Sequence, residues 1–163
     1  MRHMTKLTWD DLFLQDPEID YRQIFECWPQ IDGKVLPIGM SAFGDPFFVK
    51  PDNSVWKLDT FSGEVKQVAS SQTEFGELMN SLPWQEDHLR SLSVFQLVER
   101  GLSKGPMQVF APVPHPTHSG AVRLDRAIVL DAVVWHSISS QALGQVTPLA
   151  QPLKEEKPWW KRW

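Results

Sequence analysis

The sequence predicts an α+β fold in which an antiparallel meander sheet packs with several short helices. Four short apolar runs between residues 35 and 68 are separated by turn-forming clusters only a few residues long. Such short connections join antiparallel neighbours, because parallel strands need a crossover of about a dozen residues or more. Helical patterns stand before and after this region instead of between its strands, which disfavours a doubly wound fold.

The length and composition of the chain predict one globular domain. It has 163 residues, a 42% apolar content and a net charge of -4. A chain of this length is long enough to bury a core. We expect a single α+β domain over residues 1–147 and a flexible tail over residues 148–163, which are rich in proline, tryptophan and basic residues.

The chain carries no recognisable targeting signal, which predicts a cytoplasmic protein without a membrane partner. Its first residues include bases but no apolar core of the length that a signal peptide needs. The longest strongly apolar run, near residues 127–135, is interrupted by Asp131 and is shorter than the ~20 residues of a membrane helix. Cys27 is the only cysteine, which excludes an intramolecular disulfide and a cysteine zinc site.

Two short helices are expected before the sheet. Thr8 can cap the first helix, and acidic residues follow it where the helix dipole favours negative charge. The apolar residues of this helix share one face at helical spacing: Trp9, Leu12 and Phe13. Pro17 should end it, and residues 20–27 should form the second helix.

The strands of the meander are expected at residues 35–40, 47–49, 55–59 and 64–68. Turn-forming residues separate the last three strands, at Pro51–Ser54 and at Thr60–Gly63. The remaining elements are expected in this order: a capped helix from residue 70 that Pro83 interrupts, a helix over 86–101, a proline-rich loop over 105–120, a buried strand over 127–138 and a helical turn over 139–143.

Motifs for catalysis are weak in this sequence. The glycine-containing segments 39–44 and 101–105 fit neither the phosphate loop nor the dinucleotide fingerprint, so no cofactor is expected. Three serines follow His136 without the GxSxG elbow of a hydrolase: Ser137, Ser139 and Ser140. Cys27 has no flanking motif and is interpreted as a small core residue.

Three histidines leave a small metal hydrolase as an alternative. His115 and His118 lie three residues apart, and His136 follows later in the chain. A site of three imidazoles would suit zinc. No HExxH pattern supports such a site, and two histidines in a proline-rich loop are more often surface residues.

The segment "IGMSAFGDPFFVKPDNSVWKLDTFSGEVKQVASSQTEFGELM", residues 38–79, carries an ordered set of features. An apolar strand leads to the turn Phe43-Gly44-Asp45, which is followed by two strands and a turn that ends at Gly63. A helix containing Phe75 comes next. This order resembles the C-terminal domain of type VI secretion DNase-immunity proteins and the broader SUKH immunity superfamily. The resemblance implies a SUKH-like fold in which Phe43, Gly44, Asp45, Gly63 and Phe75 form the structural motif.

The resemblance extends over most of residues 20–145. Residues 133–138 and 141–143 are similar to the closing strand of the family and to its glutamine-containing turn of helix. The chain departs from the pattern in the proline-rich loop 105–120 and in the terminal segment "KPWWKRW", residues 157–163.

Membership of this family implies a protein that is not an enzyme. It would bind a cognate protein toxin in the producing cell and block it, and the toxin would be a type VI effector nuclease or another secreted toxin. We also expect no cofactor, no metal, no direct contact with nucleic acid, and a monomer or weak dimer.

The candidate partner-binding surface is the acidic region 9–32 together with the exposed side of the meander. A nuclease needs a basic groove, and acidic side chains on its inhibitor would steer association. The candidate residues are all acidic: Asp10, Asp11, Asp16, Glu18, Asp20, Asp45, Asp52 and Asp59. The alternative for each acid is that it only caps a helix or turn and keeps the protein soluble.

Two further interpretations stay open from the sequence. The chain can be a SUKH-like scaffold domain that binds endogenous proteins without any toxin. Its terminal segment, residues 157–163, mixes cations with three tryptophans, which is typical of an interfacial or nucleic-acid contact. The alternative for this segment is a solvated tail that folds back onto its own domain.

Overall fold

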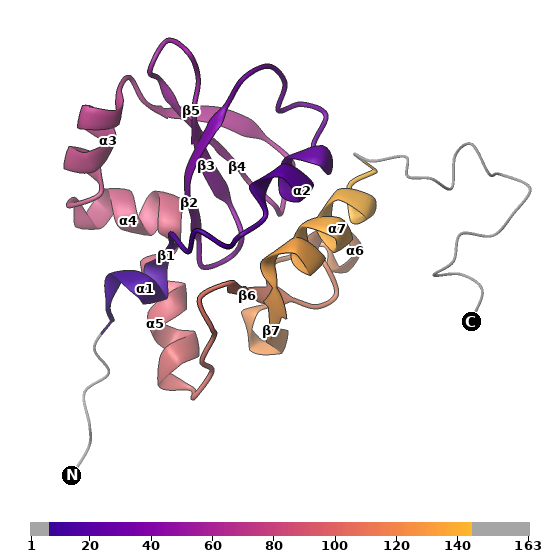
Figure 1. The fold of residues 1–163 in the computed structure, drawn as a ribbon. Helices are drawn as coiled ribbons and strands as arrows, with labels where there is room; N and C mark the ends of the chain where they lie inside the picture. The colour runs from indigo at the N-terminus through magenta and orange to yellow at the C-terminus, as the bar shows by residue number, and fades with distance from the viewer. Residues whose placement is uncertain (1–6, 145–163) are drawn as a thin grey trace, which may run out of the picture.

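The computed structural model describes residues 7–144. Its main sheet has five antiparallel strands in the order β1-β2-β3-β4-β5, so the predicted meander is confirmed (Figure 1). The strands are β1 (Phe13–Leu14), β2 (Leu36–Ser41), β3 (Pro46–Val49), β4 (Val55–Leu58) and β5 (Val65–Ala69). The tail predicted for residues 148–163 lies outside the described residues.

Helices cover both faces of this sheet. The neighbours Phe47 and Phe48 in β3 point to opposite faces, because side chains alternate along a strand. Phe47 packs with Phe75 of α3 (Gln72–Leu78) and with Trp84 of α4 (Leu82–Leu89). Phe48 belongs to a second apolar cluster with Trp28 and Leu58, on the side of α2 (Tyr21–Glu26). Figure 1 shows α3 and α4 on one side of the sheet and α2 on the other.

A two-stranded sheet and a long helix complete the fold. Strand β6 (Gln108–Pro112) pairs antiparallel with β7 (Ala127–Asp131). Between them lie α6 (Pro116–Ser119) and the 3-10 helix η1 (Leu124–Arg126). Helix α7 (Ala132–Ala142) follows directly and contacts α2. The amide of Phe110 donates to the carbonyl of Ala42 at 2.8 Å, which joins the two sheets.

The first predicted helix is shorter than expected. Helix α1 (Trp9–Leu12) ends before Phe13, which lies in β1 opposite Ser41 of β2. The ring of Phe13 lies over Gly39, where an added Cβ would come within 2.2 Å of it. Burial of this ring between β2 and the α3 side therefore favours the strand over continued helix.

The helix predicted over 86–101 is two helices. Helix α4 starts earlier, with Ser81 as its N-cap and Pro83 in its first turn, where a proline is tolerated. Arg90, which has a left-handed φ of 53°, interrupts the helix, and α5 (Ser91–Glu99) follows. The guanidinium of Arg90 lies 4.9 Å from the ring centre of Phe61, so a tertiary contact accompanies the break.

The region after residue 104 also differs from the prediction. The expected loop 105–120 contains β6, whose residues Val109, Phe110 and Ala111 are fully buried. The strand predicted over 127–138 stops at Asp131, because the Asp131 carboxylate accepts from the amide of Val133 and caps α7. The predicted helical turn over 139–143 is the end of that helix.

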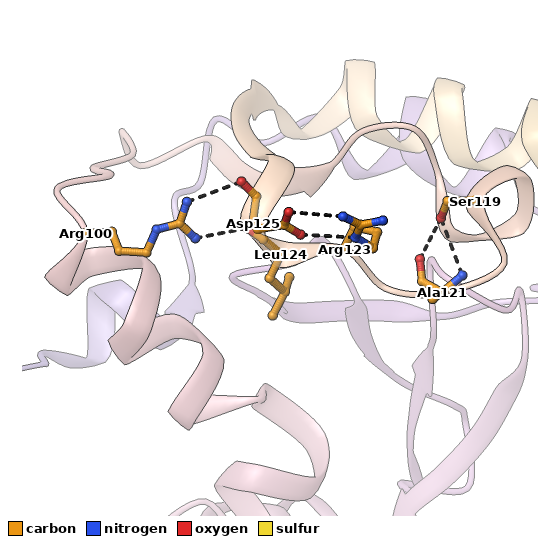
Figure 2. Close-up of polar contacts among 6 residues, drawn as sticks. All are labelled: Arg100, Ser119, Ala121, Arg123, Leu124 and Asp125. Carbon is orange, nitrogen blue, oxygen red and sulfur yellow. Dashed lines mark hydrogen bonds and ion pairs between the residues drawn. The ribbon is translucent and has the colours of Figure 1, made fainter.

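The segment between β6 and β7 is held against the end of α5. The guanidinium of Arg100 donates to the carbonyls of Leu124 and Asp125, each at 3.3 Å (Figure 2). Arg123 forms an ion pair with Asp125 at 3.2 Å beside them. Within residues 7–144, no helix has the length and apolar character needed to cross a membrane.

Candidate functional site

The turn Phe43-Gly44-Asp45, which the sequence singles out, joins β2 to β3 and is buried. Ser41 holds it in shape, because its hydroxyl oxygen accepts from the amides of Phe43 and Asp45 at 3.2 and 3.1 Å. Gly44 has a φ of +92°, a conformation that favours glycine. The turn therefore presents its carbonyls to whatever packs against it.

Helix α7 packs against this turn through two adjacent residues. The indole N–H of Trp135 donates to the carbonyl of Phe43 at 3.0 Å and to the Thr60 hydroxyl at 3.2 Å. Nε2 of His136 lies 2.6 Å from the carbonyl of Gly44. Residues 43–45, 60 and 135–136, which come from three separate parts of the chain, thus form one buried polar cluster, named here the turn cluster.

His136 is neutral in this cluster. Its Nδ1 accepts from the indole N–H of Trp28 at 2.8 Å, so Nε2 carries the proton and donates to Gly44. Burial lowers the pKa of His136 to about 4, although the bond to Gly44 favours the charged form. An imidazole in this state acts as a fixed bridge between Trp28, which lies just after α2, the turn and α7.

His115 is held in a similar way. Its Nδ1 accepts from the amide of Thr117 at 3.1 Å, and Nε2 donates to the carbonyl of Thr60 at 2.8 Å. Burial lowers the pKa of His115. Both ring nitrogens of His115 and of His136 are occupied within the chain, while His118 is exposed on α6. The three histidines do not form a ligand group in the part of the chain that the structure describes.

The candidate nucleophiles are not paired with a base. His136 uses its nitrogens for Trp28 and Gly44, so it does not activate the serines that follow it. The hydroxyl of Ser140 donates to the carbonyl of Ser137 at 3.2 Å. Cys27 is half-buried, and burial raises the pKa of its thiol, which keeps it protonated at neutral pH.

Asp45 departs from the expectation that it lies on a partner-binding surface. It is only 3% exposed, and its carboxylate accepts from the amide of Thr60 at 2.9 Å. Burial raises the pKa of Asp45, and the charge of Lys57 opposes that shift. Lys57 is itself buried, and its ammonium group donates to the carbonyl of His88 at 3.3 Å.

Most other predicted acids serve local turns or helix starts, which is the alternative that the sequence left open for them. Asp20 caps α2 by accepting from Gln23 N–H, and Asp11 accepts from the amide of Thr8. Similar bonds to an amide two residues ahead are made by Asp16, Asp52 and Asp59. The acids whose side chains are exposed are Asp10, Glu18, Asp20 and Asp52.

The exposed side of the meander is smaller than predicted. All four residues of β3 are buried, and three of the four in β4 are buried as well. Exposed residues of the meander strands lie in β5, at Lys66 and Gln67, and at the start of β2, at Leu36. Among the residues of the structural motif, Phe43, Gly44 and Phe75 are buried, while Gly63 is half-buried with a φ of +77°.

A groove that the sequence did not predict lies beside the acidic N-terminal region. Its volume is about 600 Å³, and it runs between α1 and the helices α4 and α5. We name it the Trp9 groove after its lining residues Trp9, Leu12, Asn80, Leu82, Gln85 and Leu92. The sequence does not reveal the exposure of Leu82 and Leu92, because the spacing of apolar residues predicts that both face the core.

A second hollow of about 550 Å³ shares Trp9 and Asn80 with this groove and continues past Asp10 towards Phe75. A third hollow is lined by Asp10, Asp11, Asp16 and Lys104. Trp9 therefore lies between the Trp9 groove and the second hollow, and acidic residues line the second and third hollows.

No family model and no curated protein matches the chain. Among solved structures, it is similar to Atu4351 from Agrobacterium tumefaciens, with a TM-score of 0.59. The similarity covers 82% of this chain and 68% of the Atu4351 chain at 18% sequence identity. At that identity, the similarity establishes a shared α+β fold.

Proposed function

We propose that this chain is a non-enzymatic immunity protein, which binds a cognate protein toxin in the cytoplasm of the producing cell and blocks it. The observation that carries the proposal is the turn cluster. Phe43-Gly44-Asp45 and the segment around Trp135 and His136 both belong to the resemblance and are hydrogen bonded to each other. Residues 133–138 form part of helix α7, however, and not the closing strand that the resemblance implies. The two segments that suggest the family are therefore in contact in the fold, which supports the proposal.

The chemistry of the buried polar groups supports a binding role. The imidazoles of His115 and His136 are neutral and bridge elements of the fold. Asp45 and Lys57 are buried inside the protein, away from any of the surface hollows described above. The surface includes an acidic N-terminal region with exposed apolar side chains beside it, which suits recognition of a basic protein.

The proposal is tested with the gene next to the one that encodes this chain. Deleting the gene for this chain should kill cells that keep an active adjacent toxin gene, and expressing the chain from a plasmid should restore growth. The matched control is the same deletion in cells whose toxin gene carries a disabling substitution, which should grow normally.

Survival of the deletion strain with the active adjacent gene would contradict the proposal. In that case, affinity capture with the tagged full chain tests the remaining interpretation, a scaffold domain that binds endogenous proteins. Stoichiometric recovery of the same endogenous protein in repeated captures, with no toxin gene nearby, would favour a scaffold domain.

A further inference from the structure

Three exposed apolar side chains converge on the Trp9 groove from two distant parts of the chain, α1 and the consecutive helices α4 and α5. The exposed fractions are 45% for Trp9, 74% for Leu82 and 57% for Leu92, and all three residues line the same hollow. A large aromatic residue that is half exposed between two hollows is the kind of side chain that dominates binding energy at protein interfaces. Figure 1 shows α1 beside α5, with α4 above them.

Acidic groups line and flank this apolar surface. Asp10 lines the hollow on one side of Trp9, and Asp11 and Asp16 line the next one. Glu86 lies at the other end, where its carboxylate accepts from the amide of Leu92 at 2.8 Å. Three carboxylates thus lie beside the Trp9 groove in the adjoining hollows and a fourth contacts Leu92, which gives the apolar groove acidic flanks, as at an interface with a polar rim.

Among the described residues that line these three hollows, the one cation is Lys104. Its ammonium group donates to the carbonyl of Asp10 at 3.0 Å and lies 5.8 Å from the ring centre of Phe110. Burial lowers the pKa of Lys104, while Asp11 and Asp10 oppose that shift. Three lining acids, Asp10, Asp11 and Asp16, against one inward-turned lysine leave this part of the surface negative.

We propose that the Trp9 groove is the surface that binds the partner, and that the partner inserts an apolar side chain flanked by lysine or arginine residues. This inference rests on the proposed function, because it identifies where the toxin would bind. The apolar centre supplies the contact area, and the acidic rim complements a basic surface and accelerates its approach. A basic substrate groove on a nuclease has that chemistry.

The test uses the full-length chain and a catalytically disabled form of the adjacent gene product as the probe. Trp9→Ala and Leu82→Ser should each weaken binding at least ~10-fold in a calorimetric or surface-based measurement. Asp10→Lys should slow association more than it speeds dissociation, and the wild-type association rate should fall with added salt. Because these side chains are exposed, the variants should keep the wild-type unfolding midpoint.

Matched controls lie elsewhere on the described surface. Ile128→Ser in β7 and Val134→Ser in α7 remove side chains that are 46% and 47% exposed, close to the value for Trp9. Asp125→Lys makes the same charge change as Asp10→Lys at an exposed acid between β6 and β7, outside the acidic region 9–32. All three controls should bind the probe within about twofold of wild type, as for substitutions outside an interface.

Each other result overturns the inference in a recognisable way. Equal binding by wild type and the groove variants would remove the Trp9 groove as the interface while leaving the proposed function in place. No binding by wild type would remove both. A concentration-dependent dimer that Trp9→Ala abolishes would assign the groove to a second copy of this chain. Tighter binding after Trp159, Trp160 and Trp163 are replaced by alanine would assign it to the chain's own terminal segment.

Discussion

The indole of Trp28 donates to Nδ1 of His136 at 2.8 Å, across 108 residues of sequence. An indole N–H can only donate, so this bond requires an unprotonated Nδ1 and sends the single imidazole proton to Gly44. The rings meet edge to face with their centres 5.9 Å apart. This pair therefore connects the segment after α2, the β2–β3 turn and α7 only while His136 is neutral.

Stability should consequently fall in mild acid. The pKa of His136 is about 4 in the folded chain and ordinarily 6.5, so the unfolded chain binds the extra proton first as the pH drops. The contribution of neutral His136 to the free energy of unfolding is complete above pH 6.5 and is lost progressively as the pH falls towards 4. It amounts to on the order of 3 kcal/mol, because one pKa unit is worth about 1.4 kcal/mol.

His136→Gln isolates that contribution in urea unfolding at several pH values. The amide of glutamine can still donate to Gly44 but does not titrate, so the variant should be less stable at pH 7 and approach wild type near about pH 4.5. His118→Gln, at an exposed position, serves as the control and should follow wild type. Parallel curves for wild type and His136→Gln would show that His136 does not carry the dependence.

Gly44→Ala should strongly destabilise the protein. An added Cβ would come within 2.6 Å of the Trp135 ring, and the φ of +92° disfavours any side chain. We expect a loss of roughly 2–4 kcal/mol from strain and overpacking together. Gly33→Ala is the control, because Gly33 has a φ of +74° but open space around its Cβ position. The control should lose only about 1 kcal/mol; equal losses would mean that contact with Trp135 is unimportant.

Asp45→Asn should destabilise through Lys57. An asparagine can still accept from Thr60 N–H, but it removes the negative charge that offsets the buried ammonium group of Lys57. We expect a loss on the order of 2 kcal/mol in chemical unfolding at pH 7. Adding Lys57→Met should recover part of it, because the unpaired charge is then gone. Asp52→Asn, at an exposed turn, should change little; no recovery in the double variant would contradict the coupling.

Arg100→Ala should loosen the segment between β6 and β7 without unfolding the domain. The variant loses both hydrogen bonds to the carbonyls of Leu124 and Asp125 (Figure 2). Because these bonds are exposed, global stability should fall by less than about 1 kcal/mol. Trypsin should nevertheless cleave faster after Arg123 and Arg126. Arg22→Ala, which removes only an exposed pair with Glu26, is the control; unchanged cleavage in Arg100→Ala would contradict this role.

Elements that depend on neighbours in sequence were predicted well. The strands of the meander differ from their predicted bounds by one residue at most ends, because their apolar runs and turns are both local signals. Ser71 caps α3 and Asp20 caps α2 through bonds to amides three residues ahead. Such bonds form within one turn of chain, so a short stretch of sequence contains all the residues involved.

Elements that depend on distant partners were predicted wrongly. The region of strand β6 was expected to be a loop, because prolines and glycines dominate the segment 105–120. In the structure, Phe110 pairs with Val129 of β7, and its amide donates to the carbonyl of Ala42. Arg90 interrupts an apolar stripe that continues on both sides, and its contact with Phe61 was not visible in the sequence. Asp45 looked like a surface acid for the same reason.

The sequence by itself determined the α+β class, the antiparallel order of the strands and the capped start of α3, because each follows from residues only a few positions apart. Only the tertiary structure decided that His136 is a neutral bridge, that Asp45 and Lys57 are buried and that Trp9, Leu82 and Leu92 share one groove. Burial and charge state depend on which distant segments pack together, and that packing is a property of the whole folded chain.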